Sequence, residues 1–131
     1  MKAKYLVAVA FLLIAGCKKE IEGLTSDLQG TWELTSTYWL GPVEYEPGNG
    51  NTISFSGNAY SQTIKTADTS YQYAGTFNIY TGKPCDAARK QTLIKFDDND
   101  ANSFSLSDGK LTIGTTECVL DGGSSTYKKI R

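Results

Sequence analysis

The sequence predicts an all-β domain of about eight short antiparallel strands, arranged as an up-and-down barrel or a sandwich. Residues 31–38 and 70–80 alternate between apolar and polar side chains with the period of two that half-buried strands have. The dipeptides Gly57-Asn58 and Asp108-Gly109 are typical of tight turns between paired strands. The 131 residues include 13 glycines and 8 tyrosines, and apolar runs with helical spacing are scarce. A chain of this length holds one such domain.

The N-terminal segment has the features of an export signal. Lys2 and Lys4 precede an apolar run from Tyr5 to Gly16. This run is too short to cross a bilayer, which takes about 20 apolar residues, and it indicates the hydrophobic core of a secretory signal. It ends in Leu13-Ile14-Ala15-Gly16-Cys17, which resembles a bacterial lipobox, where small residues stand directly before a cysteine that becomes lipidated.

The lipobox resemblance implies that residues 1–16 are a removable signal peptide and that Cys17 becomes an acylated N-terminus, carrying chains such as palmitate. Several acyl chains on one residue give stable membrane attachment, because each buried methylene contributes about 0.8 kcal/mol. We therefore expect a lipid anchor in the bacterial cell envelope, in the outer membrane, facing either the periplasm or the outside. The alternatives are an ordinary secretory signal with a chance cysteine and an N-terminal anchor that is never cut. Residues 17–26 are polar and charged, which predicts a tether before a domain over residues 27–131.

The folded part opens with the strand over residues 31–38. Trp32, Leu34 and Tyr38 share one face, and the threonines share the other with Glu33, so the large apolar groups are expected to point inward. Gly30 allows a sharp turn into the strand without a Cβ clash. Trp39 is out of phase with Trp32, which predicts either a bulge that turns Trp39 inward or a position at the rim.

The remaining strands are expected in sequence order, separated by turns rich in glycine, proline, asparagine and aspartate. Gly75 lies inside the longest alternating run, where a glycine often marks a bend at which a sheet curls. After the loop signal Pro47-Gly48-Asn49-Gly50, the expected strands cover residues 51–56, 59–65, 70–80, 91–97, 103–107, 110–114 and 126–131, with a short run at 118–120.

Cys85 and Cys118 remain as a pair once Cys17 is assigned to the lipid. In an exported protein such a pair most often forms a disulfide. A redox or metal-binding role is disfavoured, because the chain has no histidine and no C-x-x-C spacing.

A search for catalytic groups finds little. The absence of histidine excludes a Ser-His-Asp triad, and no glycine-rich phosphate loop is present. Glu44 and Glu46 share a face but stand beside proline and glycine, which favours solvated loop charges. Asp98 to Asn102 begins like a calcium loop, but Ser103 and Gly109 stand where the turn glycine and the closing glutamate are needed. We expect no enzyme activity, no metal and no cofactor, and without a basic cluster no nucleic-acid partner.

The aromatic side chains carry the functional hypothesis. They either fill a small barrel or line a pocket for one small molecule, with Trp39, Tyr45 and Tyr60 at its mouth. The residues whose phase predicts an inward position are Trp32, Tyr38, Phe55, Tyr71, Tyr73, Phe77, Phe96 and Phe104.

Gly30-Thr31-Trp32, placed at the first of many short strands, resembles the glycine-any-tryptophan signature of the lipocalins. The resemblance covers residues 28–131 and, with the lipobox, points to lipocalin-like lipoproteins of bacterial envelopes. It implies a barrel closed at one end by Trp32, with Arg131 a candidate to pack over the indole, and a small hydrophobic or aromatic ligand. The alternative is a structural or interaction module with a filled barrel and an unidentified protein partner. The candidate ligand-binding residues are Trp32, Tyr38, Trp39, Phe55, Tyr71, Tyr73 and Phe77.

Overall fold

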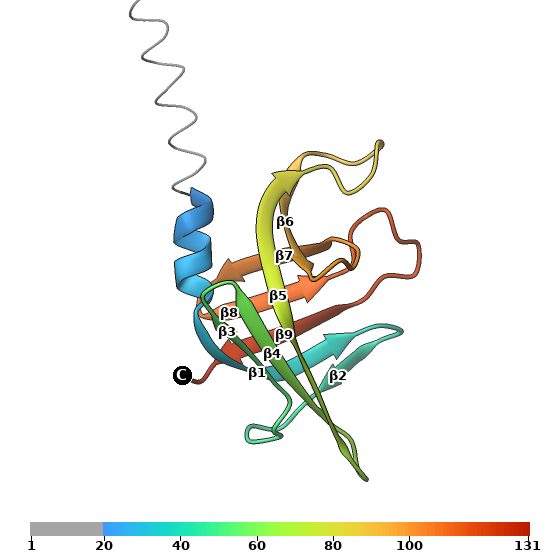
Figure 1. The fold of residues 1–131 in the computed structure, drawn as a ribbon. Coiled ribbons are helices and arrows are strands. Elements are labelled where there is room, and N and C mark those ends of the chain that lie inside the picture. Colours follow the sequence, from blue (N-terminus) through green and yellow to red (C-terminus); the bar gives the residue numbers. More distant parts are fainter. Residues whose placement is uncertain (1–19) are drawn as a thin grey trace, which may run out of the picture.

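The computed structural model describes residues 20–131, so the predicted signal peptide and Cys17 lie outside the described residues. These residues form a closed antiparallel barrel of eight strands plus the short strand β2, which confirms the predicted fold class (Figure 1). The strands are β1 (Gly30–Tyr38), β2 (Pro42–Glu44), β3 (Thr52–Ser56), β4 (Ala59–Lys65), β5 (Ser70–Gly82), β6 (Gln91–Phe96), β7 (Asn102–Ser107), β8 (Lys110–Gly114) and β9 (Ser124–Lys129).

β1 is the strand that closes the barrel. One of its edges pairs with β9 from Trp32 to Tyr38, and the other pairs first with β3 and then with β2. Sequential neighbours pair from β3 to β9, so every connection is local and up-and-down. Closure between β1 and β9 pairs the first and last strands of the wall, and the unpaired edges that remain include β2 and residues 70–76 of β5.

A β-bulge in β1 changes which side chains point inward. The pairing with β9 runs from Leu34 opposite Tyr127 to Ser36 opposite Thr126, so Thr35 is the extra residue. One extra residue reverses the alternation of the strand beyond it. The predicted inward position of Tyr38 is therefore wrong, and 57% of this residue is exposed. The same shift places Trp39 on the same face as Trp32. The bulge that does this lies at Thr35, four residues before the expected position near Trp39.

The core fills the half of the barrel around Trp32. Trp32 and Leu111 are 1% and 0% exposed, and the ring centroids of Phe55 and Phe77 lie 5.0 Å apart in an edge-to-face pair. Phe96 and Phe104 are partly buried against this cluster, as expected from their phase. The other members are Leu28, Leu34, Ile53, Ile79, Ile94 and Tyr127.

The described part of the predicted tether is helical instead of extended. Residues 20–28 form a helix, shown in blue at one end of the barrel in Figure 1. Leu28 is fully buried, and Ile21 and Leu24 pack against the core. The Gln29 side chain then joins the helix end to the β3–β4 turn, accepting a hydrogen bond from the Gly57 amide and donating one to its carbonyl. The helix thus belongs to the folded domain and covers its base.

Trp32 closes this base, as the lipocalin resemblance implies. Its indole Nε1–H donates a hydrogen bond to the Leu28 carbonyl over 2.8 Å. The cation above the ring is Lys129, with Nζ 5.4 Å from the centroid, and not Arg131. Arg131 instead acts through its backbone, whose carbonyl accepts the Thr31 N–H at 2.9 Å. Gly30 has a φ of 119°, and a Cβ there would collide with the Arg131 carbonyl, so the glycine is required for the turn into β1.

Tyr71 and Tyr73 do not lie in the core, contrary to the prediction. They stand opposite Ile64 and Gln62 of β4, but residues 70–76 pair only with β4, and pairing with β6 begins at Phe77. This half of β5 extends past the wall, and both tyrosines remain about half exposed, at 50% and 51%.

Gly75 marks the point where β5 changes partners, which agrees with the predicted bend. The Asp97 carboxylate occupies the space that a Cβ of Gly75 would take. It accepts hydrogen bonds from the Thr76 amide and the Tyr60 hydroxyl, each 2.9 Å long. Asp97 therefore fixes the bend from the neighbouring strand end.

Gly75→Ala is expected to lower the free energy of unfolding by roughly 1–3 kcal/mol, because the methyl group displaces a carboxylate that makes two hydrogen bonds. Gly41→Ala is the matched control, since no atom lies within 4 Å of its added Cβ. Urea unfolding of both variants checks this. Equal midpoints for Gly75→Ala and the wild type would contradict the role given to Asp97.

The predicted short strand at 118–120 is absent from the described chain, where residues 115–123 form a turn-rich loop between β8 and β9. Cys118 in this loop is bonded to Cys85 in the β5–β6 loop, which confirms the predicted disulfide. The same loops are joined by Glu117, whose carboxylate accepts bonds from the Arg89 amide and the Gln91 side chain.

Candidate functional site in the barrel mouth

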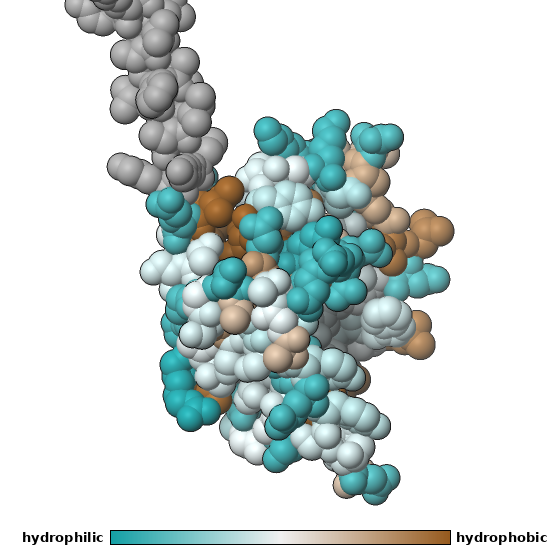
Figure 2. Space-filling view, in the orientation of Figure 1, coloured by the Kyte–Doolittle hydropathy of each residue, from teal (hydrophilic) through white to brown (hydrophobic). Residues whose placement is uncertain are grey.

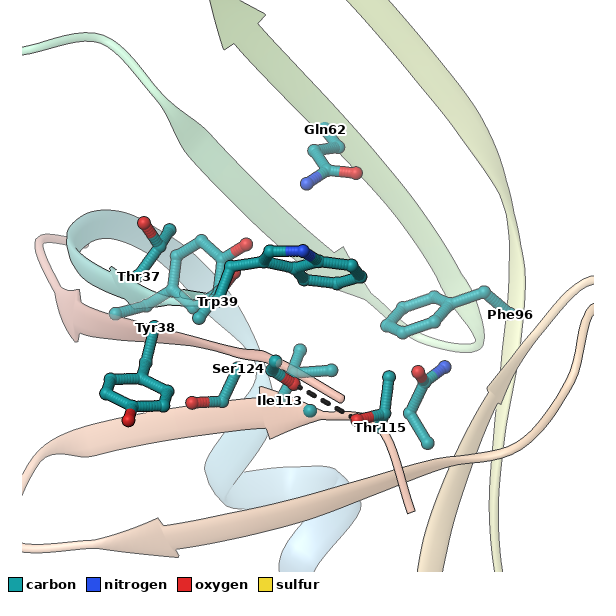
Figure 3. A pocket seen from close by; sticks show the side chains of 13 residues that line it. Thr37, Tyr38, Trp39, Gln62, Phe96, Ile113, Thr115 and Ser124 are labelled. Atoms are coloured by element: carbon teal, nitrogen blue, oxygen red, sulfur yellow. Dashed lines mark hydrogen bonds between the residues drawn. The ribbon is translucent and has the colours of Figure 1, made fainter. Parts of the chain in front are cut away.

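The barrel is hollow at the end of β1 opposite to Trp32. Two adjoining hollows, of about 380 and 340 Å³, meet there, and we call them the first and the second hollow. Both are lined by Thr37, Gln62, Ser125 and Tyr127. The first hollow, drawn in Figure 3, is also lined by Tyr38, Trp39, Phe96, Asn102, Ile113, Gly114, Thr115, Gly123 and Ser124.

Trp39 is the largest side chain at the first hollow. In Figure 3 its indole projects toward Phe96, with Gln62 on one side and Ser124 and Thr115 on the other. A Cβ at Gly123 would collide with the Trp39 ring and the Tyr38 carbonyl, so this glycine lets the ring lie close to β9. The contact with Gly123 fixes one edge of the ring, while 62% of the residue stays exposed. An exposed indole at a cavity mouth provides an aromatic face for a ligand.

The polar groups around the first hollow are neutral. Thr37 and Ser125 contribute hydroxyls from β1 and β9, and Gln62 and Asn102 contribute amides from β4 and β7. Within the described residues, no Asp, Glu, Lys or Arg lines this hollow. The second hollow adds the side chain of Lys65 at the end of β4. A mixed apolar and polar lining of this kind is typical of small-molecule sites.

Tyr45 reaches the second hollow from the loop after β2. Its backbone N–H donates to the Thr35 carbonyl at 2.9 Å, which ties the loop to the bulge. The Asn49 amide donates to the carbonyls of Leu34 and Glu46, over 2.9 and 2.7 Å. The bulge therefore positions both Trp39 and Tyr45 at the mouth.

Tyr127 separates the core from the two hollows. It is 6% exposed, and burial raises the pKa of its phenol above the ordinary value, while hydrogen bonding with Ser125 and Gln62 acts in the opposite direction. The pKa of Tyr60 is also raised, first by burial and then by Asp97. Both phenols therefore remain protonated through neutral pH.

Stability is expected to fall at alkaline pH. The folded chain holds the Tyr127 proton more tightly than the unfolded chain, so this stabilisation is fully present below the unfolded pKa of about 10 and is lost as the pH rises through the folded pKa. Urea unfolding at about pH 8 and pH 11 measures the loss. Between these pH values, Tyr127→Phe is expected to lose less unfolding free energy than the wild type. The loss that remains is attributed to Tyr60. Identical pH dependence in the two proteins would contradict a perturbed Tyr127.

The structure divides the candidate ligand-binding residues into three groups. Trp39 and Tyr38 line the first hollow, although the Tyr38 side chain is mostly exposed. Tyr71 and Tyr73 lie outside both hollows. The remaining three are buried in the core and line neither hollow: Trp32, Phe55 and Phe77.

Of the residues expected at the mouth, Tyr45 lines the second hollow, whereas Tyr60 packs edge-on against Phe96 with ring centroids 4.8 Å apart. Sequence reasoning missed Thr37, Gln62 and Tyr127 as cavity residues. The strand that holds Tyr127 has no clean apolar face in the sequence, because Ile130 is out of phase with Tyr127. The phase of Trp39 indicated a possible bulge but not its position at Thr35, on which the inward position of Thr37 depends.

Over residues 20–131, no cluster of three His, Cys, Asp or Glu side chains is arranged to hold a metal ion. No helix in this part of the chain is long and apolar enough to cross a membrane. Comparisons with protein-family models, with curated proteins and with solved structures find no match. The fold and the mouth define the class of protein: a small closed β-barrel with a helix-covered base and an uncharged first hollow at its open end.

Proposed function

We propose that this protein is a membrane-anchored, lipocalin-like lipoprotein of the bacterial cell envelope that binds a small hydrophobic or aromatic ligand and catalyses no reaction. The observation that carries the binding role is the first hollow, walled by Trp39, Phe96 and Ile113. The lipid anchor rests on the lipobox-like residues Leu13 to Cys17. Acyl chains on Cys17 hold the barrel at the membrane, in the outer membrane, and no cofactor, metal or nucleic acid takes part.

Native mass spectrometry of the full chain, extracted from bacterial membranes in mild detergent, tests both halves of the proposal. The expected protein begins at Cys17 with acyl chains attached and carries a second, non-covalent small molecule. Trp39→Ala is expected to lose the non-covalent molecule and keep the acyl chains. A chain that retains residues 1–16 and is not acylated overturns the anchor. If neither the wild type nor Trp39→Ala carries a bound molecule, the binding role is overturned.

The alternative, a non-catalytic interaction module, is favoured by one observation. Leu40 in the β1–β2 turn and Leu120 in the β8–β9 loop are 96% and 100% exposed, and Val119 is 49% exposed. Figure 2 shows separate hydrophobic spots, with more polar residues between them, at the edge where Figure 1 places this turn and this loop. Exposed apolar side chains on neighbouring loops are typical of protein contacts. Leu40→Ser with Leu120→Ser would abolish such a contact and leave ligand binding in the hollow intact.

A further inference from the structure

The first hollow has more hydrogen-bonding groups than a site for a purely apolar molecule would use. Its inward-facing side-chain donors and acceptors include Thr37, Gln62, Asn102, Thr115 and Ser125. They come from four strands and from the loop after β8, so they surround the space instead of lying on one side of it. Each has an oxygen that can accept a hydrogen bond. Thr115 already donates to the Gly123 carbonyl, and Asn102 donates to the Asp100 carbonyl. Gln62 and Ser125 also bond with the Tyr127 hydroxyl, which leaves Thr37 as the side chain of this set without such a bond to a described residue.

An acyl chain fits this lining poorly. Methylene groups pressed against the hydroxyls and amides would remove their water without replacing the hydrogen bonds, at a cost of about 1–3 kcal/mol for each group left unpaired. Long-chain fatty acids would also bring a carboxylate into a hollow whose described lining includes no cation. Among the described residues that line the two hollows, the one charged residue is Lys65, which lines the second hollow and is exposed.

The apolar part of the lining favours a ring. Trp39 offers a flat exposed face, Phe96 lies beyond its ring, and Ile113 lines the hollow on the side of Thr115. Aromatic rings gain about 0.5–1.5 kcal/mol beyond area burial when they pack on another aromatic ring in a suitable geometry. A hollow of about 380 Å³ is at the small end of the range for ligand sites, which is roughly 300–1,000 Å³. One or two rings are the appropriate size.

From these three features we infer that the first hollow binds an uncharged ring compound that carries hydroxyl or amide groups on its edge and packs one face on Trp39. A neutral sugar ring and a neutral nucleoside share this chemistry. The inference rests on the proposed binding function and revises its ligand class, because a nucleoside is aromatic but a neutral sugar is neither hydrophobic nor aromatic. The ring supplies the face for the indole, and its polar edge replaces the water on Gln62, Asn102 and the hydroxyls.

Tryptophan fluorescence of the full-length lipoprotein in detergent tests the ligand class. The chain has 2 tryptophans, and Trp32 is 1% exposed, so a change on ligand addition reports on Trp39. The probes are N-acetylglucosamine and adenosine, each with its phosphorylated form as a matched charged compound, and dodecanoate. We expect a saturable shift with at least one neutral compound, at least tenfold weaker binding of its phosphorylated form, and no shift in Trp39→Phe beyond that of buffer. Which neutral compound binds distinguishes the sugar from the nucleoside.

Gln62→Leu keeps the size of the side chain and removes its amide. It is expected to weaken binding of the neutral compound by about three- to tenfold, the equivalent of one hydrogen bond. Gln72→Leu is the control, because Gln72 is exposed on β5 and lines neither hollow. If dodecanoate binds while both neutral compounds fail at millimolar concentration, the ligand class is overturned and the binding function stands. If no probe binds and native mass spectrometry finds no bound molecule, both are overturned.

Discussion

Trp32→Ala is expected to lower the free energy of unfolding by about 3–5 kcal/mol, the range for removing a large aromatic side chain from a core. Trp32 is 1% exposed, and its indole joins β1 to the end of the helix over residues 20–28 through the bond to the Leu28 carbonyl. Truncation leaves a cavity at the base and an unpaired carbonyl there. Urea unfolding of the variant and the wild type measures the difference.

Trp39→Ala is the matched control, because it removes the same side chain from the other end of the strand. Trp39 is 62% exposed, so the expected change in unfolding free energy is within about 1 kcal/mol. The loss of unfolding free energy in Trp32→Phe is expected to lie between those of the two alanine variants. The phenyl ring still fills part of the space, but the hydrogen bond is lost. Similar losses for the two alanine variants would contradict the assignment of Trp32 to the closed base and Trp39 to the mouth.

Removal of the disulfide is the second large effect. In the double variant Cys85→Ala, Cys118→Ala, the loss is expected to be about 3.8 kcal/mol, the chain-entropy value for a loop of this length. The bond ties the β5–β6 loop to the β8–β9 loop, and the second of these contributes Thr115 and Gly123 to the first hollow. The double variant is therefore expected to lose ligand affinity as well as stability.

The reduced wild type is the control for this variant. Unfolding in the presence of dithiothreitol is expected to give the same midpoint as the double variant, because both lack the covalent link. Glu117 still holds the loops through its bonds to Arg89 and Gln91, so the folded barrel is expected to persist in both. An unchanged midpoint in the double variant would contradict a net stabilising role for the disulfide.

The strands and the disulfide could be predicted because their signals are local. The expected strand at 59–65 matches β4, and the expected strand at 110–114 matches β8, since alternation and turn dipeptides are set by neighbouring residues. The helix over residues 20–28 was missed. Ile21, Leu24 and Leu28 have helical spacing, but only three apolar side chains lie among charged and polar ones, and the helix is supported mainly by packing on the barrel.

By itself the sequence determined the all-β class, the order of the strands, the pairing of Cys85 with Cys118 and the place of Trp32 in the core. Only the tertiary structure decided which aromatic side chains reach the mouth. The extra residue at Thr35 turns Tyr38 outward and brings Trp39 into phase, and the change of partners in β5 leaves Tyr71 and Tyr73 about half exposed. The physical reason is that alternation places a side chain on a face of a strand, whereas barrel closure and the length of each neighbour determine what covers that face.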